Sequence, residues 1–270
     1  MKRTPSKTQQ MGFTLIEMLV AMGIFLLICG AAFTLLGTSQ QRYRTESQVL
    51  NSFQEARLGL DQIVRDVNDA GFPPPTFASA NPNLSASSPF AWSFGYPNAP
   101  CLLGPYGGGT CSSIPGDFEL IIETNPNPQD PGSTVQWIRY KLKETTLMRG
   151  MAGKVLGDDP VFDTDGFLVP FVQNVINNPS PDVIAQYQAI YPGMFPGGKP
   201  VPVFTYTCDT PTVPQPPATS CSAAGPDNSP ANIREVAITL IVATPLPDAT
   251  TGNPRVVTLS GRGRRVNPNR

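Results

Sequence analysis

The hydrophobic and polar positions divide the first 70 residues into an apolar run and an amphipathic stretch. Residues 18–41 carry no charged side chain and consist mostly of Leu, Ile, Met, Ala, Phe and Gly. About 20 apolar residues in a helix are enough to span the hydrocarbon core of a bilayer. We therefore predict a transmembrane helix over residues 13–37.

From residue 38 to residue 70 the pattern becomes that of a helix with one apolar face. Apolar residues recur at alternating steps of four and three, which places them on one side of a helix. Charges of alternating sign follow at i,i+4 spacing on another side. The apolar positions are Val49, Phe53, Ala56, Leu60, Ile63, Val67 and Ala70, and the charged positions are Arg57, Asp61, Arg65 and Asp69.

The distribution of proline predicts that both stretches form a single helix. No proline lies between Pro5 and Pro73, although the chain contains 31. Proline is excluded from helix interiors, and Gly71 shortly before Pro73 is a usual helix stop. An unbroken helix over residues 13–70 would be roughly 87 Å long at 1.5 Å per residue.

Beyond residue 70 the hydrophobic pattern is that of short strands and long connections. Two stretches rich in proline and poor in charge, residues 71–116 and 200–232, are predicted to be surface loops. A helix followed by antiparallel hairpins predicts an α+β fold in which the amphipathic half of the helix packs on an antiparallel β-sheet. The predicted strands cover residues 117–123, 136–143, 146–149, 234–243 and 256–259.

Composition argues against an enzyme. The chain has no histidine, only 14 % charged residues and a net charge of −1. The absence of histidine excludes Ser-His-Asp triads, Cys-His pairs and His-ligated zinc. Composition does not exclude a hydrolase built on carboxylates alone, which makes a membrane-anchored enzyme the remaining alternative. No catalytic constellation appears in the sequence, so we predict no catalytic residue and no cofactor.

Two charged clusters each allow a functional and a structural interpretation. Asp158, Asp159, Asp163 and Asp165 could hold calcium, but the EF-hand register fails, and Asp-Pro and Asp-Gly turns explain them equally well. We predict no metal site. The arginines after residue 248 fit a solvated strand face better than a nucleic-acid contact, because no aromatic residues are interleaved with them.

The amino terminus carries a processing signature. Residues 1–12 are polar and basic, and they run into Gly12-Phe13-Thr14-Leu15-Ile16-Glu17 at the start of the apolar segment. A secretory signal is cleaved after its apolar region, whereas this leader ends before it. Glu17 is a lone carboxylate in an apolar helix, and such residues are usually functional.

This motif resembles the class III signal of type IV pilins and type II secretion pseudopilins. The resemblance implies that prepilin peptidase cuts after Gly12 and that Phe13 becomes the N-methylated first residue. It also implies that the Glu17 carboxylate pairs with the terminal amine of a neighbouring subunit during filament assembly. Many pilins have a helix-breaking proline where this chain has Thr34. Gly23, Gly30 and Gly37 lie near one helix face and could serve close helix contact, local melting or ordinary packing.

The order of elements resembles, more loosely, the PilW-type minor pilins and the related J-type pseudopilins. The resemblance implies a minor pilin that assembles into a type IV pilus or primes or caps it. A J-type pseudopilin is the alternative, and a pilus-tip adhesin or DNA-binding subunit is a further one. The implied partners are prepilin peptidase, other major and minor pilins or pseudopilins, the inner-membrane assembly platform and the membrane. Nucleic acid is not an expected partner.

The predicted topology divides the chain into four parts. These are a cleaved cytoplasmic leader (residues 1–12), a transmembrane helix (13–37), its amphipathic continuation (38–70) and a periplasmic body (71–270). The leader cations fit the positive-inside rule for a single-pass inner-membrane protein. After assembly, the subunit would lie in the pilus at the cell surface.

The cysteines fit an exported body. Cys101, Cys111, Cys208 and Cys221 would lie in an oxidising compartment, where four cysteines permit three pairings. We favour the local pairing, Cys101 with Cys111 and Cys208 with Cys221, because each pair brackets a loop rich in Pro, Gly or Ser. A metal site or reactive thiols are the alternatives. Cys29 is predicted to be a small apolar packing residue.

Overall fold

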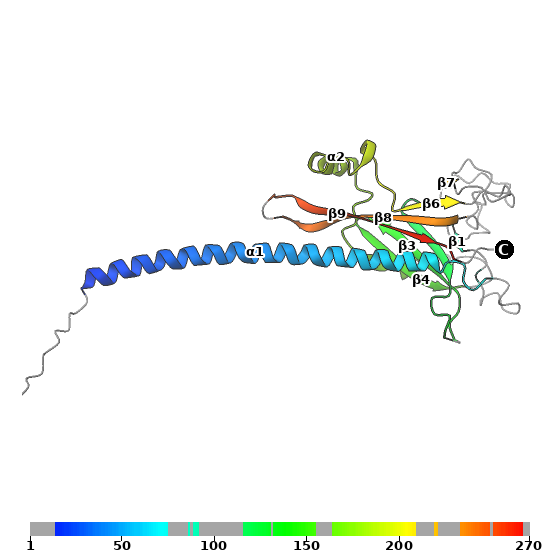
Figure 1. Cartoon of the computed structure of the whole chain (residues 1–270), viewed down its shortest axis with the longest axis horizontal. Helices are drawn as coiled ribbons and strands as arrows, with labels where there is room; N and C mark the ends of the chain where they lie inside the picture. The colour runs from blue at the N-terminus through cyan, green and yellow to red at the C-terminus, as the bar shows by residue number, and fades with distance from the viewer. Residues whose placement is uncertain are drawn as a thin grey trace, which may run out of the picture. The chain divides into compact units, whose positions relative to one another are not determined.

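A single long helix, α1 (Leu15–Asn68), begins the described part of the chain (Figure 1). The computed structural model describes residues 14–74, 86, 89–91, 116–130, 132–154, 164–208, 219–220, 233–248 and 251–266. The chain divides into two compact units, Met1–Ser47 and Gln48–Arg270. The helix prediction is confirmed, and Gly71 at a φ of 81° follows the helix end, in the left-handed region that glycine adopts readily.

Two antiparallel sheets make up most of the second unit (Figure 1). The first, in the order β1-β2-β3-β4-β5, contains β1 (Phe90–Ala91), β2 (Glu119–Thr124), β3 (Gln136–Lys143), β4 (Thr146–Gly153) and β5 (Val169–Val172). The second, in the order β7-β6-β8-β9, contains β6 (Phe204–Cys208), β7 (Thr219–Ser220), β8 (Ile233–Pro247) and β9 (Pro254–Arg264). Between them in sequence lie α2 (Pro181–Ile190) and the 3₁₀ helices η3 (Thr164–Phe167) and η4 (Pro196–Gly198).

The five strands expected from the hydrophobic pattern are confirmed as β2, β3, β4, β8 and β9, three of them longer than predicted. In β8, for example, Val236, Ile238, Leu240 and Val242 are all fully buried, as the alternation indicated. The prediction of a loop over residues 200–232 is wrong where β6 and β7 occur. Phe204 and Tyr206 are buried in β6, and the surrounding prolines concealed this short alternation.

The two sheets meet where β2 begins and β6 begins. The carbonyl oxygen of Asp117 accepts hydrogen bonds from the backbone N–H of Val203 at 2.8 Å and of Phe204 at 3.0 Å. The Tyr206 hydroxyl donates to the backbone oxygen of Glu119 at 2.9 Å. One hydrophobic core therefore contains residues from both sheets and from the second half of α1.

Within this unit, α1 contacts strands that lie at the outer edges of the two sheets. A Cβ placed on Gly59 would lie 2.3 Å from Val172 of β5, and one placed on Gly263 of β9 would lie 2.5 Å from Val67. Only glycine permits such approaches, because real Cβ atoms essentially never come this close. The predicted apolar stripe is buried here at Ala56, Leu60, Ile63, Val67 and Ala70, the last of which follows the end of α1, whereas the charged positions from Arg57 to Asp69 are exposed.

The other face of the second sheet carries α2 and a smaller core. Ile184 of α2 and Phe195 pack with Ile241 and Ala243 of β8. The Asn177 side chain donates to the backbone oxygens of Val201 and Thr239 and accepts from the N–H of Ile241. The Asn177 side chain thereby satisfies backbone groups of β8 that a neighbouring strand would otherwise pair with. The hydrophobic pattern did not predict α2, which begins with proline at its first position.

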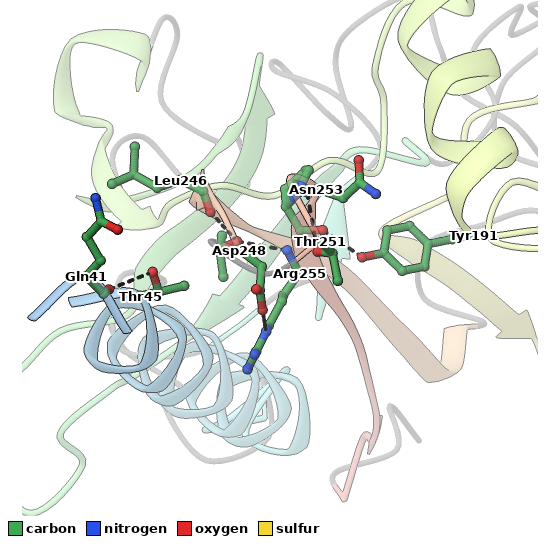
Figure 2. A network of polar contacts seen from close by, with 10 residues as sticks. Gln41, Thr45, Tyr191, Leu246, Asp248, Thr251, Asn253 and Arg255 are labelled. Atoms are coloured by element: carbon green, nitrogen blue, oxygen red, sulfur yellow. Dashed lines mark hydrogen bonds and ion pairs between the residues drawn. The ribbon is translucent and has the colours of Figure 1, made fainter. Parts of the chain in front are cut away.

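The turn between β8 and β9 is held by polar contacts (Figure 2). The Arg255 guanidinium forms an ion pair with the buried Asp248 carboxylate, and the Tyr191 hydroxyl donates to the Pro254 oxygen at 2.7 Å. The Thr244 hydroxyl accepts the N–H of Arg255 and donates to the oxygen of Leu246. These bonds fix the ends of the turn and the register of the hairpin.

Candidate functional site

The start of α1 holds the part of the processing motif that the structure describes. Gly12 and Phe13 lie outside the described residues, and Thr14 is the first residue within them. The Glu17 carboxylate accepts the backbone N–H of Thr14 at 3.0 Å and the Thr14 hydroxyl at 2.9 Å. In return, the Glu17 N–H contacts the Thr14 hydroxyl oxygen at 3.4 Å.

This exchange is a capping box, in which a Thr and a Glu three residues later satisfy each other's backbone donors. The first N–H groups of a helix have no intrahelical partner, and a negative charge is favourable at this end. Glu17 therefore has a role within its own chain that its lone position in an apolar helix did not suggest. The Thr-x-x-Glu spacing was the signal that could have revealed Thr14 as its partner.

The segment that follows is apolar and exposed in the isolated chain. It is long and apolar enough to cross a membrane, as judged by length and composition. Ideal Cβ atoms built on Gly23, Gly30 and Gly37 meet nothing within 4 Å. Thr34, at the position where many pilins have proline, donates its hydroxyl to the Ala31 oxygen at 2.7 Å. The helix continues through this point without a break.

The remaining residues predicted to have special roles are mostly outside the described part of the chain. Cys101, Cys111 and Cys221 lie outside it, and Cys208 is described only as the last residue of β6. The disulfide pairing therefore stays a prediction. Cys29 is a free thiol on α1. In the acidic cluster, the backbone of Asp165 belongs to η3, and the other three aspartates lie outside the described residues.

A polar cluster holds the second half of α1 on the first sheet. The Asp66 carboxylate accepts the Tyr140 hydroxyl at 2.5 Å and a guanidinium N–H of Arg149 at 2.9 Å. Its other oxygen accepts the Gln62 side-chain amide at 2.7 Å. Arg149 also donates through Nε to the Tyr140 oxygen at 2.9 Å, and its guanidinium lies 6.0 Å from the centre of the Phe171 ring.

The electrostatics of this cluster favour one protonation state. Burial and then the negative charge of Asp66 raise the pKa of Tyr140, so its hydroxyl stays protonated and donates. Asp66 is only 6 % exposed and requires these donors, because a buried carboxylate without partners is costly. Sequence analysis missed Asp66 because the cluster joins residues far apart in the chain. Its position between the apolar residues Ile63 and Val67 was the available signal.

Comparison with known proteins supports the processing motif. Residues 8–35 match the family model described as the prokaryotic N-terminal methylation motif. No curated protein and no solved structure matches the chain. The chain thus carries the N-methylation motif that forms the class III prepilin signal of type IV pilins and pseudopilins. This motif lies at the start of an apolar N-terminal helix that is followed by an α+β body, and that arrangement is similar to the fold of pilins and pseudopilins.

Proposed function

We propose that this chain is a minor type IV pilin, processed between Gly12 and Phe13 and N-methylated on Phe13. The methylation motif over residues 8–35 is the observation that carries the proposal. The described helix adds support, because removal of residues 1–12 would leave the apolar segment of α1 attached to the body. In this proposal residues 13–37 span the inner membrane, and residues 38–270 form the periplasmic part of the subunit.

The capping box supports a two-stage role for Glu17. Before assembly, its carboxylate is held by Thr14 of the same chain at 2.9 and 3.0 Å. After cleavage the terminal amine would belong to Phe13, one residue before the cap. During assembly, the carboxylate of Glu17 would pair with the terminal amine of a neighbouring subunit, since each charge alone is costly in a low-dielectric environment.

The test is the intact mass of the full chain after co-expression with a prepilin peptidase. We expect loss of residues 1–12 and one added methyl group on Phe13, whereas a chain that stays uncleaved would refute the proposal. Gly12→Val should block cleavage. Glu17→Gln should be cleaved normally but enter filaments poorly, since it keeps the size of the side chain and loses its charge.

Assembly with pilus subunits would distinguish a minor pilin from a J-type pseudopilin. The processed chain should enter pili in cells that carry a type IV pilus machinery. Entry only into the filament of a type II secretion system would make it a pseudopilin instead. Both outcomes keep the motif and its processing, so this experiment separates the finer assignment from the coarser one.

A further inference from the structure

Among the described residues, the backbone of β9 from residue 256 to residue 262 has no hydrogen-bond partner on the side that faces away from β8. It forms an edge of the second sheet, and the Arg264 N–H points away from β8, because it donates to the side-chain oxygen of Asn68 at 2.8 Å. Backbone groups alternate in direction along an antiparallel strand. The N–H and C=O groups of residues 256, 258, 260 and 262 therefore also point away from β8. No hydrogen bond joins these groups to another residue of the described ranges.

The hydrogen bonds on the opposite side of β8 independently identify which backbone groups of β9 point away from β8. The N–H of Thr239 donates to Val203, and that of Ala243 donates to Asn174, so the odd-numbered residues of β8 face away from β9. The even-numbered residues of β8 consequently bond to the odd-numbered residues of β9, from Val257 to Gly263. This alternation identifies which amides of β9 are available to another chain.

The open edge is regular and exposed. Thr258, Ser260 and Arg262 are exposed, and the register with β8 is continuous from Val256 to Arg264. No proline interrupts residues 255–264. Natural proteins usually protect such edges, because a row of unpaired N–H and C=O groups is a template for another strand.

The other sheet edges that the structure describes are protected by short strand length, by proline or by a side-chain hydrogen bond. β1 and β7 have only two residues each. β5 has four residues, one of them Pro170, and the N–H of Gln173 just after it donates to the Glu55 carboxylate at 2.9 Å. Among the described edges, β9 combines length, regularity and exposure.

The side chains along this edge indicate the chemistry of its partner. Arg262 is 77 % exposed at its side chain, and its guanidinium lies 3.4 Å from Glu235. Arg264 is exposed next to it. Val257 and Leu259, on the opposite face of the strand, are partly buried against the core. A matching segment would be extended, apolar on one face, and acidic on the other.

We propose that residues 256–262 of β9 bind an extended segment of another filament subunit, which adds to the sheet as a further strand. A carboxylate of that segment pairs with Arg262. Main-chain hydrogen bonds supply affinity in this mode of binding, and alternate side chains supply specificity. The proposal rests on the filament role proposed above, and it names the surface through which a neighbouring subunit is held.

A proline substitution tests the backbone contact. Ser260→Pro removes an N–H that has no partner among the described residues, and proline is tolerated at such edge positions. Ser260→Ala retains the N–H and is the matched control. We expect the proline variant to enter filaments about tenfold less than the alanine variant, the effect of weakening binding by about 1.4 kcal/mol. Equal incorporation of the two variants would overturn the proposal.

Hydrogen exchange of the unmodified full chain keeps the test valid if the proline variant fails to fold. The amides of Thr258, Ser260 and Arg262 should exchange at least about tenfold more slowly in filaments than in the detergent-solubilised chain. The amides of Val257 and Leu259, already paired with β8, should change little. Equally fast exchange of the outward amides in both states would overturn the proposal. Protection that rises with the concentration of the isolated chain would also overturn it, because the occupant would be a second copy.

The charge of Arg262 provides a second measurement. Arg262→Glu should reduce incorporation into filaments, and Arg262→Lys should largely restore it. If Arg262→Glu and Arg262→Lys enter filaments to the same extent, the proposal that the partner segment is acidic is wrong. The intact mass of the chain distinguishes failure of the docking proposal from failure of the proposed function. A processed chain that enters filaments with an unprotected edge refutes only the docking proposal, whereas an uncleaved chain refutes the function itself.

Discussion

Arg149 stabilises the packing of the second half of α1 on the first sheet through hydrogen bonds of its guanidinium group. Its side chain donates to Asp66 and to Tyr140 and is only 20 % exposed. Arg149→Ala would leave the buried carboxylate with fewer donors, and hydrogen bonds to charged groups contribute about 1.5–3 kcal/mol each. We expect a loss of about 2–4 kcal/mol in the free energy of unfolding, measured by urea denaturation of the full chain in mild detergent.

The matched control for this substitution is Arg262→Ala. Arg262 is also an arginine in an ion pair, but its side chain is 77 % exposed and its nearest carboxylate oxygen is 3.4 Å away. Exposed pairs contribute about 0–1 kcal/mol, so this variant should unfold near the native midpoint. Similar losses for both variants would contradict the assigned role of Arg149.

Residue-scale features were predictable only where they depend on neighbours in sequence. Glu17 was identified by the motif around it, and the Thr14–Glu17 cap has a sequence signature of its own. The bond between Asp66 and Arg149 joins residues 83 positions apart, so no local pattern predicts it. Asn177 and Tyr140 likewise acquire partners only when segments distant in sequence come together.

At the scale of elements, glycine sets the distance between α1 and β9. A Cβ on Gly263 would lie 2.5 Å from Cγ1 and 2.6 Å from Cβ of Val67. Gly263→Ala should therefore force the helix and strand apart and reduce the free energy of unfolding by about 1–3 kcal/mol. Gly153→Ala in β4 is the control, because a Cβ there meets nothing within 4 Å. A thermal unfolding midpoint that falls equally in both variants would contradict this packing.

The elements themselves followed from the sequence where their pattern was long or self-contained. The helix and β3 were predicted nearly as they occur, since each has a sustained period of its own. The sequence did not predict three short elements that lie among prolines, namely β5, β6 and α2. Their structure depends on contacts with β4, with β8 and with the small second core, respectively. The two sheets are joined at Asp117, whose backbone oxygen accepts hydrogen bonds from Val203 and Phe204, and no periodicity reveals this contact.

At the scale of the whole molecule, the folding unit begins within the helix. Sequence analysis placed the start of the exported body at residue 71, where the helix stop occurs. The compact unit in the structure begins at Gln48, and Ala56, Ile63 and Val67 are fully buried in its core, as expected for an amphipathic half-helix that packs on the sheet. The second half of α1 is therefore part of the body's hydrophobic core as well as the continuation of the apolar N-terminal segment.

This difference predicts the behaviour of two truncated chains. Residues 48–270 retain the buried face of α1 and the Asp66 cluster, so this fragment should be soluble and unfold in one cooperative transition. Residues 71–270 lose the side chains that fill the core between the sheets, which should leave a large apolar surface exposed. We expect the shorter fragment to aggregate or to bind a hydrophobic dye strongly. Calorimetry and size-exclusion chromatography measure both outcomes, and a cooperative transition in residues 71–270 would show that the helix is dispensable for the fold.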